Sequence, residues 1–172
     1  AFPKVESDVE KMQILHLDSV GSKQAMLVSN WMRERMKDVL VLSDNPYMIN
    51  SVNLTKNDKE YAETLRYLKL VVVEYGYMGA FVCNDEGLVT IATINESVGR
   101  DLAEKDFFKH SIQGQTFASS IVPSEVPLVN ELDEREIGVP TMFVTTPLKN
   151  KNNDIVGVVV LRVHVGELSN MV

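Results

Sequence analysis

Several features that would assign this chain to a class are scarce or missing. The sequence has one cysteine, Cys83, so no internal disulfide can form. Its longest apolar runs, residues 70–73 (LVVV) and 158–161 (VVVL), are far shorter than the roughly 20 residues of a membrane-spanning helix. Lys plus Arg number 17 against 24 Asp plus Glu, and no basic stripe is present. An acidic surface repels a phosphate backbone, so nucleic acid is not an expected partner.

Motifs for catalysis, metal binding and cofactor binding are also missing. The three histidines (His16, His110 and His164) are far apart, and no Cys-x-x-Cys-His or His-Glu-x-x-His motif occurs. There is no glycine-rich phosphate loop and no nucleophile elbow. The acidic stretch 125–136 lacks the spacing of a calcium loop and is expected to be a solvated excursion. We therefore expect a non-catalytic domain without a cofactor, any enzymatic output lying elsewhere in its parent protein.

What remains is an ordinary globular composition. The 172 residues are 45% hydrophobic and 24% charged, which suits one domain with one well-filled core. The chain begins Ala-Phe-Pro-Lys without an initiator methionine and ends directly after a strongly apolar segment. We expect it to be an excerpt of a longer protein.

Hydrophobic periodicity divides the chain into a helical part and a strand-rich part. Three-and-four spacing predicts a long helix over residues 8–43, ended by Asn45-Pro46, and a second helix over 58–74, ended by Gly76. A short helical piece is predicted over 47–52. After Gly76 the period changes to two, which predicts strands over 79–83, 88–94, 115–121, 141–146 and 155–165. Residues 97–111 are predicted to be irregular to helical, and 123–140 to be a long polar loop.

This order of elements predicts an α+β fold. Two hairpins flank a helical crossover, and no strand–helix alternation is present to build a parallel sheet. We expect a five-stranded antiparallel sheet with the long N-terminal helix packed on one face. We therefore predict a single domain over 1–172, with a stalk helix (1–45), a helical segment (46–76) and a sheet lobe (77–168).

Motifs along most of the chain carry a family likeness. They occur at residues 81–92 (FVCNDEGLVTIA), 99–108 (GRDLAEKDFF), 114–117 (GQTF), 138–147 (GVPTMFVTTP) and 154–160 (DIVGVVV). In this order and spacing they resemble the PAS-like Cache domains, and residues 30–46 are similar to the stalk helix of the same receptors. The resemblance implies a PAS-like Cache fold.

The resemblance also implies a role. Cache domains are extracytoplasmic sensors of bacterial and archaeal chemoreceptors, histidine kinases and cyclic-nucleotide enzymes, placed between two membrane helices. They bind small molecules on one face of the sheet. The implied protein is a periplasmic or extracellular sensor domain of a membrane-anchored receptor, signalling through its stalk helix and forming a homodimer through it. A one-lobe sensor and the first lobe of a double-Cache region both remain open.

The strand predicted over 155–165 is the most informative segment for ligand binding. Strict alternation places Ile155, Gly157, Val159, Leu161, Val163 and Val165 on one apolar face, expected to pack under the helices. Arg162 and His164 share the other face. Burying a cation is costly unless it is paired, so a protein carboxylate or a ligand must meet these side chains. Alternatively, they lie past the edge of the sheet in solvent.

The Cache resemblance adds further candidates. Lys105 matches the position of an Arg that holds a ligand carboxylate, Phe107 belongs to the aromatic pair, and Phe117 matches a Tyr. Ser119 and Arg162 fall where amino-acid-binding members carry Asp, so this pocket is expected to favour an anion such as a small carboxylate. The candidate ligand-binding residues are Phe81, Cys83, Lys105, Phe107, Phe117, Ser119, Arg162 and His164.

Two alternatives stay open. In one, Phe81, Phe107 and Phe117 fill the cavity themselves, and the domain is a structural, interaction or dimerisation module. In the other, the chain is a cytosolic PAS-like or GAF-like cofactor domain. The long amphipathic start and the closing hairpin argue against the second alternative.

Overall fold

The computed structural model describes residues 22–166 and 168. The helices are α2 (Ser22–Ser43), α3 (Pro46–Ser51), α4 (Lys59–Tyr75), the single 3₁₀ turn η1 (Asn95–Ser97) and α5 (Asp106–Ile112). The strands are β1 (Gly79–Asn84), β2 (Val89–Ala92), β3 (Phe117–Ala118), β4 (Val122–Pro123), β5 (Leu128–Val129), β6 (Arg135–Glu136), β7 (Pro140–Lys149) and β8 (Ile155–His164). The part of the long helix predicted over residues 8–21 lies outside the described residues.

The predicted ends of the helices are confirmed. The side chain of Asn45 accepts a hydrogen bond from the backbone N–H of Tyr47, and Pro46 starts α3 with the backbone angle that a first helical turn requires. Gly76 follows α4 with a φ of +74°, and its N–H donates to the carbonyl of Val72. A glycine fits this left-handed position without strain, so the chain turns directly from α4 into the sheet.

The main sheet is antiparallel, as predicted. Its strands run in the order β2-β1-β8-β7-β3, and the short β4 also pairs with β7 to give six strands in all. Three strand predictions are corrected. The sheet expected to have five strands has six, because β4 joins it. The strand expected over 115–121 pairs only at β3, and the loop expected over 123–140 contains the β5–β6 hairpin.

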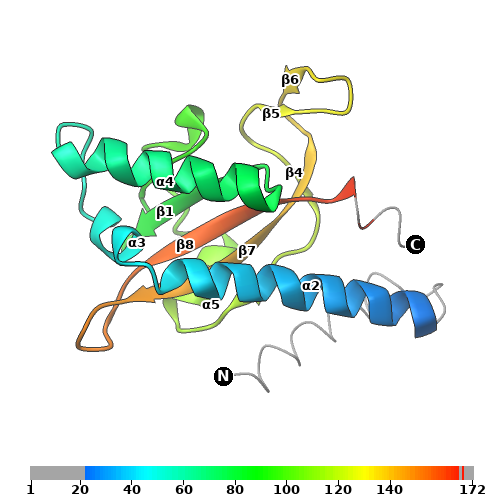
Figure 1. Ribbon diagram of the computed structural model, residues 1–172, viewed down its shortest axis with the longest axis horizontal. Coiled ribbons are helices and arrows are strands. Elements are labelled where there is room, and N and C mark those ends of the chain that lie inside the picture. The colour runs from blue at the N-terminus through cyan, green and yellow to red at the C-terminus, as the bar shows by residue number, and fades with distance from the viewer. Residues whose placement is uncertain (1–21, 167, 169–172) are drawn as a thin grey trace.

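The two faces of the sheet have different cores. In Figure 1, α2 and α4 cover one face, where Val159, Leu161 and Val163 pack among the helical side chains. On the other face Val158 and Val160 pack with the phenylalanines of β1, α5 and β7. The predicted alternation of β8 is therefore confirmed from Gly157 to Val163. Earlier in the strand it fails, because the pairing with β7 shifts register and Val156 packs on the helix-covered side.

Candidate functional site

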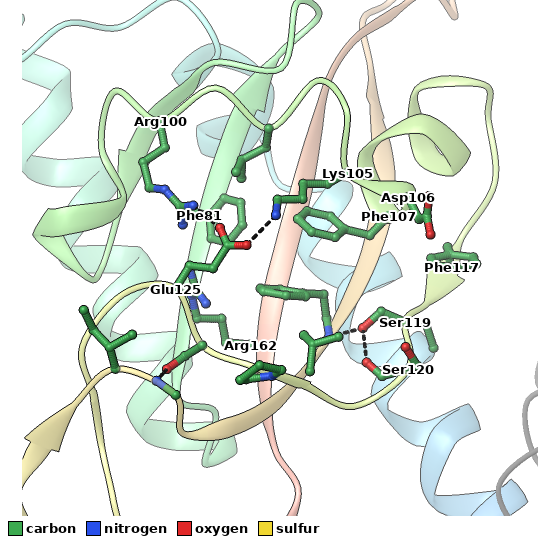
Figure 2. Close-up of a pocket in the computed structure, with 18 residues that line it drawn as sticks. Phe81, Arg100, Lys105, Asp106, Phe107, Phe117, Ser119, Ser120, Glu125 and Arg162 are labelled. Atoms are coloured by element: carbon green, nitrogen blue, oxygen red, sulfur yellow. Dashed lines mark hydrogen bonds and ion pairs between the residues drawn. The ribbon is translucent and has the colours of Figure 1, made fainter.

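A cavity of about 930 Å³ opens on the face of the sheet opposite α2 and α4. Its walls come from β1, β7 and β8, the segment leading into α5, β3, the residues around β4, and the turn between β6 and β7 (Figure 2). Six of the eight predicted candidates line it: Phe81, Lys105, Phe107, Phe117, Ser119 and Arg162. The fold thus brings together residues that are up to 81 positions apart in the sequence (162 − 81).

Arg162 is the most unusual side chain of this cavity. It is 2% exposed and forms no salt bridge with any described residue. One terminal nitrogen, Nη2, donates to Oγ of Ser97 at 3.2 Å, while Nε has no hydrogen-bond partner. Its guanidinium carbon lies 5.2 and 5.0 Å from the ring centroids of Phe81 and Phe143.

The charge of Arg162 is therefore held in a poorly solvated place. Burial, followed by the neighbouring charge of Arg100, lowers its pKa to about 10, and the charge of Glu125 opposes this shift. The guanidinium still carries its charge at neutral pH. A buried cation without a carboxylate partner can receive an anion.

The mouth of the cavity holds a three-residue ion-pair cluster. Oε2 of Glu125 accepts from Nη2 of Arg100, and Oε1 accepts from Nζ of Lys105 (Figure 2). The hydrogen bond from Lys105, followed by that from Arg100, holds the pKa of the Glu125 carboxyl below its usual value. Glu125 is exposed, as expected for stretch 125–136, but its carboxylate also pairs with two cations of the cavity lining.

An aromatic wall completes the lining. The rings of Phe107 and Phe143 stack with centroids 4.4 Å apart, and Phe81 meets both edge-on at 6.4 and 6.3 Å. Phe117 stacks on His110 at 4.1 Å. Such a wall offers apolar surface to the carbon skeleton of a small ligand.

Ser119 lines the cavity, but its hydroxyl is already engaged. Oγ accepts from the backbone N–H of Phe143 at 2.8 Å and donates to the carbonyl of Ser120 at 2.8 Å. The backbone N–H of Ser119 also donates to the carbonyl of Phe143 at 2.8 Å. Ser119 therefore fixes the chain after β3 against β7, which shapes this wall of the cavity.

His164 and Cys83 lie away from the cavity lining. His164 is the last residue of β8, is exposed, and accepts a hydrogen bond at Nδ1 from the N–H of Gly166. Its expected place beside Lys105 and Arg162 is taken by Arg100. The reason is that the pairing of β8 with β1 stops at Arg162. His164 still pairs with Thr141 of β7, but its side chain is exposed at the end of the sheet, as the open alternative allowed.

Cys83 is fully buried in the apolar cluster on the cavity side of the sheet. Burial raises the pKa of its thiol to about 12, so the reactive thiolate is rare at pH 8. We expect no reaction of the folded protein with Ellman's reagent, and reaction of the one cysteine after addition of guanidinium chloride. A rapid reaction in native buffer would contradict this burial.

The sequence did not predict twelve of the eighteen lining residues, and two of these form the ion-pair cluster with Lys105: Arg100 and Glu125. Arg100 lies inside the motif at 99–108, so its charge close before Lys105 was a usable signal. Glu125 gave no comparable signal, because its partners are 20 and 25 positions away in the sequence.

The architecture is a PAS-like, Cache-type fold, and similar folds occur in solved sensor domains. The sensor domain of the V. cholerae histidine kinase DctB superposes with a TM-score of 0.63 at 16% identity, over 87% of this chain and 56% of that one. The E. coli DcuS sensor domain gives 0.60 at 13% identity, over 81% and 92%. The sensory domain of the Campylobacter jejuni chemoreceptor Tlp3, solved with isoleucine bound, gives 0.59 at 12% identity, over 98% and 66%.

These likenesses establish the fold. No family model and no curated protein matches the sequence. Within the described residues, no helix is both long and apolar enough to cross a bilayer. The same residues contain no group of three or more His, Cys, Asp or Glu side chains placed to hold a metal ion.

Proposed function

We propose that this chain is the extracytoplasmic ligand-binding sensor domain of a transmembrane signalling receptor, and that its cavity binds a small carboxylate. One observation carries the proposal: a buried arginine without a carboxylate partner lines a cavity of about 930 Å³. The Cache-type fold supports it, because the similar structures are sensor domains.

The ligand class follows from the charges of the lining. Arg162 brings a positive charge without a carboxylate partner to the lining, and a carboxylate is the natural acceptor for a guanidinium. The stacked rings of Phe107 and Phe143 would contact the apolar part of the ligand. An amine would meet a cation at this position, so amines are disfavoured.

A route for the signal runs from Arg162 to the proposed stalk helix. The carbonyl of Arg162 accepts a hydrogen bond from the N–H of Met78 at 2.9 Å. The preceding residue, Tyr77, donates its hydroxyl proton to Asp38 of α2. A ligand that shifts β8 would thereby shift the balance between two arrangements of α2, which would signal through a homodimer of the stalk helices.

The competing reading, an interaction module with a collapsed pocket, requires the aromatic side chains to fill the cavity. Phe81, Phe107 and Phe117 line the cavity but leave it open. This favours ligand binding.

A thermal-shift screen against mono- and dicarboxylates tests the proposal. A carboxylate at 100 times its dissociation constant should stabilise the protein by about 2.7 kcal/mol. Amines of similar size serve as the control and should give no shift. Stabilisation by amines alone would contradict the anion proposal, and an unchanged melting temperature with every compound would favour the interaction module.

A further inference from the structure

Glu125 lines the same cavity as the buried Arg162 but is itself exposed, and its carboxylate joins Arg100 and Lys105 at the cavity mouth. We propose that Glu125 is a built-in carboxylate that competes with the acidic group of an incoming ligand for Arg100 and Lys105. The inference rests on the proposed function and adds the residue that sets affinity and selectivity.

The geometry resembles that of a bound carboxylate. Each oxygen of Glu125 has its own cation, with Arg100 at Oε2 and Lys105 at Oε1. Both cations come from the segment between η1 and α5, on the opposite side of the mouth from Glu125 (Figure 2). A ligand carboxylate in the same place would find the same two donors.

The backbone that carries Glu125 is fixed, so only its side chain is free to leave. The residues on either side, Ser124 and Val126, are each 3% exposed. Oγ of Ser124 accepts from the N–H groups of Gly138 at 3.1 Å and Val139 at 3.0 Å. Displacement of Glu125 is therefore a change of side-chain rotamer, without movement of the loop.

Partial exposure lowers the free-energy cost of replacing the Glu125 carboxylate by that of a ligand. The side chains of Arg100, Lys105 and Glu125 are 29%, 41% and 49% exposed, so water and salt weaken their ion pairs. Glu125 also places a negative charge close enough to affect Arg162. Its removal would leave Arg100 and Lys105 without their carboxylate partner. Three cations would then face one acidic side chain of the lining, Asp106, which favours a ligand with two acidic groups over a ligand with one.

Calorimetry on the wild type and Glu125→Gln tests the inference, with succinate and butyrate as probes of equal chain length. Because exposed ion pairs are individually weak, succinate should bind the variant about 3- to 10-fold more tightly, and butyrate should gain less. Glu125→Asp, which is too short to reach both cations, should fall between the two proteins.

Glu96→Gln is the matched control. Glu96 accepts from Arg135 at 2.7 Å, in an exposed ion pair that also joins the η1 segment to the 120–139 segment, but neither residue lines the cavity. Its succinate affinity should equal that of the wild type. An equal gain in Glu96→Gln would overturn the inference, because loosening of the mouth would then explain both gains.

The remaining outcomes separate this inference from the proposed function. If the wild type binds succinate and Glu125→Gln binds it equally well or more weakly, the inference alone is overturned. Glu125 would then have no effect on affinity, or it would hold its two cations in position for the ligand. Binding of succinate to the variant but not to the wild type would support it strongly. Failure of both proteins to bind either probe would overturn both proposals.

Discussion

Replacing Arg162 with methionine should abolish carboxylate binding and leave the ligand-free protein at least as stable as the wild type. In the proposed complex, Arg162 and the ligand carboxylate form a buried charge pair. Removing one partner of such a pair costs about 2–5 kcal/mol of binding free energy, so affinity should fall by roughly 30-fold or more. The side chain of Arg162 has an unsatisfied Nε and no salt bridge with a described residue. An apolar side chain of similar length can pack between Phe81 and Phe143 without the cost of desolvating a charge.

Opposite effects on binding and stability would identify Arg162 as a binding residue. Succinate calorimetry and urea denaturation measure the two quantities on the same samples. Arg135→Met is the control, because Arg135 is an exposed arginine outside the cavity lining, and it should bind like the wild type. Arg162→Lys keeps the charge without the planar fork and should retain part of the affinity.

Two results would contradict the role proposed for Arg162. Loss of both stability and binding would make it a structural residue, held in place by Ser97 and the two aromatic rings. Undiminished binding in Arg162→Met would place the anion elsewhere in the cavity.

The sequence predicted the faces of the sheet well, because burial on both sides imposes a period of two. That period alone placed Arg162 on the other face of the sheet from Leu161 and Val163, which is the face where the cavity lies. It could not place His164, because the pairing of β8 with β1 stops at Arg162, and His164 is left at the exposed end of the strand, paired with Thr141 of β7. Where a strand ends depends on the lengths of the strands beside it, which no local pattern records.

Glu125 illustrates a second limit of prediction. Its position is fixed by hydrogen bonds from Gly138 and Val139 to Ser124, and its carboxylate reaches Arg100 and Lys105. All of these contacts are long-range. Composition marked the region as acidic and therefore solvated, whereas tertiary contacts turn this one carboxylate toward two cations.

Strand β3 shows a similar override of local pattern. Alternation predicted a strand over 115–121, but pairing with β7 is limited to Phe117 and Ala118. Beyond them, the hydroxyl of Ser119 takes the hydrogen bond from the N–H of Phe143 that a strand carbonyl would otherwise accept. The chain leaves the sheet here and forms a wall of the cavity.

The second large effect is expected at Gly157, where α3 and β1 press against the central strand. A Cβ at this position would lie 2.4 Å from the carbonyl oxygen of Cys83 and 2.6 Å from Cγ1 of Val52. Gly157 pairs with Asn84 on one side and Leu148 on the other, so its backbone has little room to shift. We expect Gly157→Ala to lower the free energy of unfolding by about 3 kcal/mol or more.

Gly99→Ala provides the comparison that isolates this clash. Gly99 has a φ of +85° with open space around its missing Cβ, so alanine there should cost only about 1 kcal/mol of backbone strain. Urea denaturation followed by circular dichroism would measure both variants. If Gly157→Ala lost no more stability than Gly99→Ala, α3 would be free to lift from β8. The close contact between Val52 and the central strand would then not be a rigid part of the platform that holds Arg162 in place.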